Sequence, residues 1–303
     1  MGSGVVAVAD DGRDDAREER ARNTKRKIAL AVQYRGTEFR GFQRLAHART
    51  VQGELDRALA RMGIEEANVT GSSRTDAGAH AILHPVTFET DRHYPPETFV
   101  RALNAFLPTS IRVLDAREVP YAFHPRANAL YREYLYLMKF GEEFDPFLSG
   151  LAGFERTVPS PDDVRSLLAS LVGTHDFRSF VKKSAEAENC VRTVMAADFG
   201  FDERSRTGVF FFRANGFMWG MIRSMIGAVL SVARGERTRA AFEELLAKPS
   251  DESIPMPVVA GGLYLFYTEY APPLFERRRA AFPLVAAGAA AREVLERAGI
   301  FID

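Results

Sequence analysis

The hydrophobic positions of this 303-residue chain follow two periods, one typical of helices and one typical of strands. In the segment 50–62, Val51, Leu55, Leu59 and Met62 fall on one face of a helix. The segment 96–106 begins with proline, which favours a helix start. Runs rich in β-branched and apolar residues predict strands at 27–34, 67–70, 82–90, 111–119 and 129–140.

The second half of the chain repeats this alternation of strands and helices. Pro146, Gly150 and Gly153 interrupt the pattern and predict a boundary between the halves. We therefore expect two α/β halves, residues 27–145 and 154–270, with mainly antiparallel sheets. The pattern in the second half predicts helices at 160–172, 217–233 and 238–248, and strands at 191–201, 209–214 and 263–270.

Two segments lie outside these halves. Residues 1–26 place a short apolar piece before a mixture of aspartates and arginines, which reverses the order found in a signal peptide. This order predicts a mobile charged tail on a cytoplasmic protein. Residues 271–303 form a C-terminal extension with an alanine-rich, helix-like end, and its apolar residues predict docking onto the rest of the chain. These apolar residues are Phe282, Leu284, Val294 and Leu295.

The composition excludes several classes of protein. A single cysteine, Cys190, cannot form an internal disulfide or a thiolate metal cage, and it suits a reducing compartment. The longest apolar runs are too short to span a bilayer. The formal net charge is zero, so any affinity for nucleic acid must come from a local concentration of cations.

One loop offers such a concentration. Residues 35–49 contain only one acid, Glu38, while Phe39 and Phe42 lie between the cations. Interleaved cations and aromatic rings suit phosphates and unstacked bases, although a solvated surface loop is the alternative reading. The cations are Arg35, Arg40, Arg44, His47 and Arg49.

A second loop carries candidate chemistry. Residues 71–81 read G-S-S-R-T-D-A-G-A-H-A and separate two runs that favour strands. Gly78 permits a sharp turn, which would hold Asp76 out at the end of a strand. The alternative is that Asp76 merely caps the turn through a side-chain bond to the backbone.

These residues carry a family resemblance. The segment R-T-D-A-G-A-H-A resembles the signature of the TruA-type tRNA pseudouridine synthases, and further matches follow in the family's order. Ser73 stands where the family usually has glycine, and Ala79 where valine is usual. These departures bear on substrate position more than on chemistry. The resemblance covers about residues 27–270, and its further matches lie at 34–43, 50–52, 123–126, 132–136, 173–177, 192–193, 217–223 and 261–264.

The resemblance implies a fold and an activity. The fold would be α+β, with two ferredoxin-like (RRM-like) halves that share an extended, mixed and mainly antiparallel sheet around a central active-site cleft. The activity would be isomerisation of uridine to pseudouridine at positions 38 to 40 of the anticodon arm of tRNA, with Asp76 as nucleophile. It also implies a homodimer, with one tRNA spanning both protomers, and chemistry without a cofactor.

The expected long helix contains a charge in an apolar stripe. Arg223 lies within the stripe formed by Trp219, Ile222, Ile226 and Leu230. A guanidinium in that place either extends to solvent or meets a carboxylate, because an unpaired buried charge costs several kcal/mol. The resemblance names this carboxylate as Asp76, and such a pair would keep it ionised and orient one oxygen toward the substrate.

The resemblance also assigns substrate-binding residues. Tyr134 and Tyr136 point the same way from a predicted strand, and Tyr134 corresponds to the active-site tyrosine that stacks on a flipped uracil, while Tyr136 is assigned to packing. Arg74 would occupy the space that the flipped nucleotide vacates. Arg126 and Arg192 would contact phosphates, and Leu263 would form an apolar wall of the site.

Two alternative classes remain at this point. One is an RNA-binding protein with the same scaffold and no turnover, although Asp76 would then have no chemical use. The other is a metal-dependent hydrolase built on His80, His84 and Asp176, which requires the two histidines to converge. The family uses the segment that contains Asp176 as a structural turn. The sequence contains no phosphate-binding glycine motif that would indicate a nucleotide cofactor.

Overall fold

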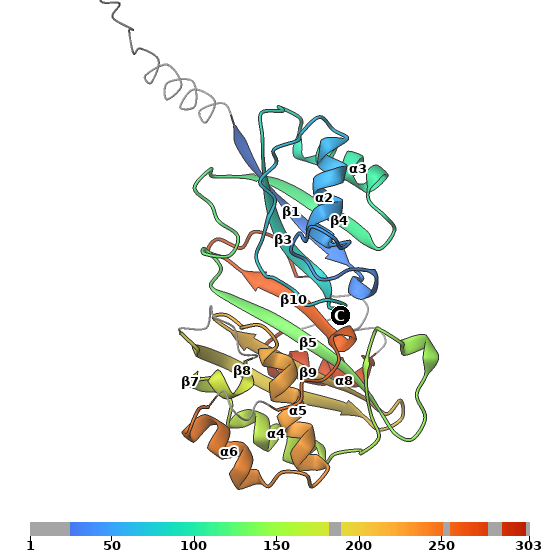
Figure 1. Cartoon of the computed structure of the whole chain (residues 1–303), viewed down its shortest axis with the longest axis vertical. Helices are drawn as coiled ribbons and strands as arrows, with labels where there is room; N and C mark the ends of the chain where they lie inside the picture. The colour runs from blue at the N-terminus through green and yellow to red at the C-terminus, as the bar shows by residue number, and fades with distance from the viewer. Residues whose placement is uncertain (1–24, 182–188, 251–254, 278–286, 301–303) are drawn as a thin grey trace, which may run out of the picture.

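The computed structural model describes residues 25–181, 189–250, 255–277 and 287–300 (Figure 1). The predicted N-terminal tail therefore lies almost wholly outside the described residues, and Arg26 already belongs to the first strand. Phe282 and Leu284 of the C-terminal extension also lie outside them.

All the described strands form one sheet. The order is β4-β1-β3-β10-β5-β9-β8-β7, with β2 beside β3 and β6 beside β5. The sheet continues without interruption across the predicted boundary near residue 150, because β5 pairs with both β9 and β10. The strands are β1 Arg26–Tyr34, β2 Thr70–Gly71, β3 His80–Thr90, β4 Ile111–Val119, β5 Tyr131–Phe140, β6 Gly153–Glu155, β7 Gly173–Asp176, β8 Val191–Asp202, β9 Thr207–Ala214 and β10 Leu263–Glu269.

The last strand enters the middle of this sheet. β10 runs antiparallel to β5 and joins β3 by a short parallel pairing, in which Tyr264 faces His80 and Leu265 faces Ala81. The other neighbours along the main path are antiparallel. The predicted α+β class with a mixed, mainly antiparallel sheet is confirmed.

The helices cover the two faces of the sheet unequally. Figure 1 shows α2 and α3 over one end and α4, α5 and α6 over the other, while α8 packs against β8 and β9. On β9, Phe210 and Phe212 belong to the core beneath α2–α6, and Val209 and Phe211 belong to the core beneath α8, as the alternation of a strand requires. No helix of the described segments is long and apolar enough to cross a membrane. The helices are α2 Val51–Ala60, α3 Pro96–Phe106, α4 Pro161–Ala169, α5 Met221–Ala233, α6 Arg239–Ala247 and α8 Ala289–Arg297.

Several predicted elements differ in the structure. The strand expected at 67–70 shrinks to β2, because Asn68 adopts a left-handed conformation with φ of 48° that interrupts an extended backbone. Asp176 lies in the short edge strand β7 rather than in a turn. The helix expected from 217 begins only at Met221, since Gly220 before it has φ of 76°. Trp219 is therefore not on the helix, and its place in the buried stripe was wrong.

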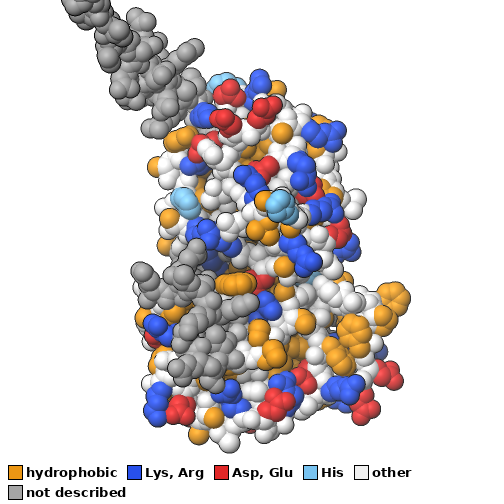
Figure 2. Space-filling model, viewed as in Figure 1, with side chains coloured by type: hydrophobic (Ala, Val, Ile, Leu, Met, Phe, Trp, Pro, Cys, Tyr) orange, Lys and Arg blue, Asp and Glu red, His pale blue; other side chains and the backbone are white. Residues whose placement is uncertain are grey.

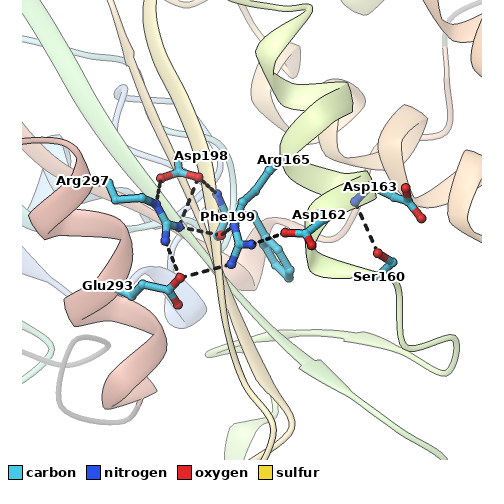
Figure 3. Close-up of polar contacts among 8 residues, drawn as sticks. All are labelled: Ser160, Asp162, Asp163, Arg165, Asp198, Phe199, Glu293 and Arg297. Atoms are coloured by element: carbon cyan, nitrogen blue, oxygen red, sulfur yellow. Dashed lines mark hydrogen bonds and ion pairs between the residues drawn. The ribbon is translucent and has the colours of Figure 1, made fainter.

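The C-terminal helix α8 is anchored on the sheet, as the extension was expected to be. Val294 and Leu295 are fully buried, and the carbonyl of Ala290 lies so close to Gly200 of β8 that a side chain at Gly200 would collide with it. Figure 3 shows the polar contacts beside this core: Arg297 donates to Asp198 at 2.6 Å and also binds Glu293. Arg165 of α4 binds the same glutamate at 3.1 Å, together with Asp162 and the carbonyl of Phe199.

A buried glutamate ties the segment before α8 to the sheet. Glu133 of β5 is fully buried and binds Arg213 of β9 at 2.7 Å and Arg277 at 2.9 Å. The guanidinium of Arg277 also lies 4.2 Å from the centre of the Tyr267 ring. Two arginines thus compensate one buried carboxylate, which is the condition under which such a charge is tolerated.

We expect Glu133→Ala to lower the free energy of unfolding by about 3–5 kcal/mol, because it leaves Arg213 and Arg277 without their shared carboxylate. Urea denaturation of the wild type and the variant measures this difference. The matched control is Glu243→Ala, which removes an exposed pair with Arg239 and should cost less than about 0.5 kcal/mol. Equal effects of the two substitutions would contradict a supporting role for Glu133.

Candidate active site

A cavity of about 970 Å³ opens between the two parts of the molecule and collects residues from distant segments. Figure 2 shows several Lys and Arg side chains in blue near the middle of one face of the molecule. Six arginines line the cavity, and Asp76 is the only carboxylate among the described residues of the lining. All seven residues that the sequence assigned to the site line this cavity, namely Arg74, Asp76, Arg126, Tyr134, Arg192, Arg223 and Leu263.

The loop that carries Asp76 is held by backbone contacts with the segment before α2. The amide of Phe42 donates to the carbonyl of Thr75 at 3.2 Å, and the amide of Gly78 donates to the carbonyl of Phe39 at 3.1 Å. Gly41, with φ of 92°, approaches Thr75 so closely that an added Cβ would lie 2.8 Å from its carbonyl oxygen. The position of Asp76 thus depends on two packed loops rather than on its own side chain.

Asp76 forms an ion pair across the cavity with α5. Nη1 of Arg223 lies 2.8 Å from Oδ2 of Asp76, and Nε of Arg223 donates to the carbonyl of Val258 at 2.7 Å. The Asp76 side chain is only 9 % exposed. Among the hydrogen bonds of the described residues, its carboxylate accepts from Arg223 and from no backbone amide. The pair therefore fixes one carboxylate oxygen and leaves Oδ1 for a molecule in the cavity.

Tyr134 and Leu263 supply the apolar side of the site. Tyr134 lies on β5, and its ring meets that of Phe217 edge to face at a centroid distance of 5.3 Å. Burial raises the pKa of the Tyr134 hydroxyl, with Ser73 beside it acting in the opposite direction. Tyr136 is fully buried and donates to the carbonyl of Val259 at 2.8 Å, which fits its expected packing role. Leu263 pairs with Tyr136 between β10 and β5 and lines the cavity beside them.

The arginines of the cavity lie close enough together to affect one another. Burial lowers the pKa of Arg126, and the charges of Arg74 and Arg132 lower it further. Arg74 is exposed between two buried neighbours, so its side chain extends from the loop. Arg192 of β8 is anchored through the carbonyls of Asn189 and Val191. A chain of zero net charge thus concentrates positive potential where an anionic polymer can enter.

The basic loop 35–49 differs from the expectation. Phe39 and Phe42 are buried, so their rings cannot stack on bases, because they form part of the core beneath α2. Arg44 pairs with Asp56 and Arg49 with Glu54, so these cations are neutralised within the chain. Of the arginines in this loop, Arg40 lines the cavity.

Sequence reasoning gave no role to Arg132, which the structure places beneath the cavity. Its guanidinium is almost fully buried and donates to the carbonyls of Ser72, Arg126 and Asn215 at 2.7–3.2 Å. These three carbonyls belong to the Asp76 loop, the Arg126 loop and the segment before α5. The signal was present in the sequence, since Arg132 lies two residues before Tyr134 on the same strand face.

The histidines also had an unforeseen role. The buried His84 accepts the amide of Ser73 at Nε2, at 3.2 Å, and its Nδ1 lies 3.1 Å from the Tyr34 hydroxyl. That hydroxyl in turn lies 2.7 Å from Oγ1 of Thr75. Since the amide of Ser73 can only donate, His84 is neutral with its proton on Nδ1. This buried chain of hydrogen bonds supports the Asp76 loop from below.

His80 forms hydrogen bonds with three separate segments and does not converge with His84 on a shared metal site. It accepts the amide of Gly36 at Nδ1, while Nε2 lies 2.9 Å from the carbonyls of both Gly150 and Gly261. The ring nitrogens of both histidines are thus engaged within the protein, and Asp176 binds the backbone of Arg178. No group of three His, Cys, Asp or Glu side chains within the described ranges is placed to hold a metal ion.

His84 predicts a pH dependence of stability. Burial lowers the pKa of His84 from 6.5 to about 3, and the charges of Arg126 and Arg132 act in the same direction. Between pH 6.5 and pH 3, His84 is therefore protonated in the unfolded chain but neutral in the folded chain. The free energy of unfolding keeps its full value above pH 6.5 and decreases as the pH falls toward 3. We expect a slope of up to about 1.4 kcal/mol per pH unit in this range.

Urea denaturation between pH 7 and pH 4 tests this dependence. Because carboxylates titrate over part of the same range, the comparison is with His84→Gln, which cannot titrate and can still accept the Ser73 amide. The wild type should lose stability more steeply than the variant. Parallel curves would show that His84 does not contribute to the pH dependence.

Known proteins match most of this chain in sequence. The family model described as tRNA pseudouridine synthase matches residues 30–126 and 167–271. The tRNA pseudouridine synthase A of Exiguobacterium sp. is 36% identical over 245 residues, which cover 81% of this chain and 98% of the relative. The enzyme of the same name from Bordetella petrii is 38% identical over 248 residues, covering 81% of this chain and 92% of the relative.

Proposed function

The chain belongs to the tRNA pseudouridine synthase family, and we propose that it isomerises uridines at positions 38 to 40 of the anticodon arm with Asp76 as nucleophile. The observation that carries this proposal is the Asp76 carboxylate, which Arg223 holds at 2.8 Å through one oxygen. It is the single acid in the described lining of a cavity that arginines dominate. A carboxylate that is held in one orientation with one oxygen left free is suited to nucleophilic attack.

The chemistry proceeds from this carboxylate. Asp76 attacks the flipped uridine at C1′ of the ribose or at C6 of the base, and the bond between C1′ and N1 breaks. The uracil rotates, C5 forms the new bond to C1′, and the bond between the uridine and Asp76 breaks, which regenerates the carboxylate. C5 then loses its proton, while N1 regains one. Tyr134 packs against the flipped base, and Leu263 closes the apolar side of the cavity. The raised pKa of Tyr134 keeps its hydroxyl protonated and able to donate a hydrogen bond at neutral pH.

The arginines of the cavity bind the RNA backbone and fill the gap that the flipped nucleotide leaves between its neighbouring bases. Arg74 is exposed two residues before Asp76, which suits a side chain that fills the space of the extruded nucleotide. Arg126 and Arg192 line the same cavity and bind phosphates. The proposal extends to a homodimer in which one tRNA contacts both protomers, and to action in the cytoplasm. Sedimentation of the protein with and without tRNA measures the number of protomers in the complex.

Tritium release tests the proposed function. A tRNA that carries 5-tritiated uridine loses tritium to water only if C5 forms the new bond to the ribose. We expect release by the wild-type chain with a chelator present and no metal added, followed by mapping of the modified uridines. Tight binding without release would favour a silent RNA-binding protein, and hydrolysis of the RNA that needs a bound metal, without tritium release, would favour the metal-dependent hydrolase.

A further inference from the structure

The single tryptophan of the chain lies at the rim of the cavity that contains Asp76. Trp219 lines the cavity and is 55% exposed, although a side chain of this size is usually mostly buried. The segment that carries Trp219 is packed on both sides, so the exposed indole projects from an anchored backbone.

The backbone on each side of Trp219 is anchored. Phe217 packs against Tyr134, and Met221, the first residue of α5, is fully buried. The amide of Met221 donates to the carbonyl of Met218 at 3.2 Å, and Gly220 turns the chain with a left-handed φ of 76°. The indole is therefore presented from a fixed turn, which lowers the entropy that a ligand would have to overcome.

A second exposed apolar side chain lines the cavity. Leu45 lines the same cavity from the loop before α2 and is 51% exposed, and a bridge between Leu45 and Ala48 closes its turn. Arg40 and Arg192 contribute cations to the lining. A rigid aromatic surface beside cations is the combination that proteins use to stack unpaired bases while they track the phosphates.

We propose that Trp219 is a stacking platform for an unpaired base of the RNA that lies next to the target uridine. This inference rests on the proposed function, because it assumes that the flipped uridine occupies the cavity beside Asp76. When the uridine flips out, the neighbouring base loses its stacking partner on one side. That base remains at the rim, and the indole of Trp219 stacks on its exposed face. Phe39 and Phe42 cannot serve this purpose, since both rings are buried.

Fluorescence tests the contact directly, because the emission of a single tryptophan reports only on position 219. The probes are an anticodon stem-loop RNA and a blunt RNA duplex of equal length, each titrated into the wild-type protein. We expect saturable quenching by the stem-loop and clearly weaker quenching by the duplex at equal occupancy. Binding of the stem-loop without a change in emission would overturn the proposal.

Substitutions separate stacking from packing. Trp219→Ala should raise KM for the stem-loop by about 5- to 100-fold and change kcat by less than about threefold. Trp219→Phe should recover most of this loss because it keeps an aromatic face, whereas Trp219→Leu should not. The control is Phe147→Ala, which removes an aromatic ring that is 89% exposed and does not line the cavity.

The outcomes distinguish this proposal from the proposed function. An unchanged KM in Trp219→Ala, or equal rescue by phenylalanine and leucine, would overturn the stacking role of Trp219. Tritium release by the wild type would still support the proposed enzymatic function in that case. Quenching by the stem-loop without tritium release would overturn the enzymatic function while the contact with an unpaired base remained. Thermal melting of each variant verifies that the compared proteins are folded.

Discussion

We expect Asp76→Asn to reduce tritium release by more than about a thousandfold, while the Kd for tRNA changes by less than about tenfold, or roughly 1.4 kcal/mol. Asparagine has nearly the same shape as aspartate but no charge, so it cannot form the covalent bond to the uridine. The RNA contacts proposed for Arg126 and Arg192 do not involve this carboxylate. Single-turnover rates and filter binding on the same tRNA measure the two effects separately.

The fold should tolerate this substitution. The loop is held by backbone hydrogen bonds from Phe42 and Gly78, and Arg223 keeps its bond to the carbonyl of Val258. The matched control is Asp198→Asn, because Asp198 also pairs with an arginine but lies beside α8, away from the cavity. Turnover near the wild-type rate in Asp76→Asn would show that Asp76 is not the nucleophile. Loss of folding in this variant would indicate that Asp76 is a structural cap.

The second large effect is expected for Arg223→Ala, with kcat lower by about a hundredfold or more and a smaller change in KM. Arg223 holds Asp76 through Nη1 and is itself fixed by Val258 through Nε, so its removal frees the nucleophile to adopt unproductive orientations. The substitution also leaves the largely buried Asp76 carboxylate without the cation that compensates its charge. Steady-state kinetics on tRNA measure kcat and KM.

Arg223→Lys refines this test. Lysine keeps the positive charge but cannot present two separate donors in the fixed geometry of a guanidinium, so we expect activity between that of alanine and the wild type. Arg297→Ala is the control, because Arg297 pairs with an aspartate far from the cavity. Unchanged turnover in Arg223→Ala would exclude a role for this pair in catalysis.

The local elements were largely predictable from the sequence. The helix Pro96–Phe106 and the strand Ile111–Val119 lie where the periodicity placed them, because hydrophobic periodicity and a proline start act within the segment itself. The start of α5 was not predictable in this way. The backbone angle of Gly220 ends the preceding turn, and no periodic pattern records that angle.

The polar support of the site was also invisible in the sequence. Arg132 looked like an ordinary strand residue, His84 drew attention only as a candidate metal ligand, and the aromatic rings of the basic loop looked available to RNA. Their burial depends on which segments pack above them, so the carbonyls that bind Arg132 come from three places far apart in the chain.

By itself, the sequence predicted most of the helices and strands in their order, because these depend on local pattern, but it missed the short strands β6 and β7. The α+β class and the candidate chemistry of Asp76 came from the family resemblance of its motifs. The resemblance had also named Asp76 as the partner of Arg223, but local pattern cannot bring together two residues that are 147 positions apart, and only the tertiary structure does so. That meeting requires β10 to enter between β3 and β5, so that the loop of one part faces the helix of the other. Contacts of this kind depend on sheet order and strand register, which only the packing of the whole chain establishes.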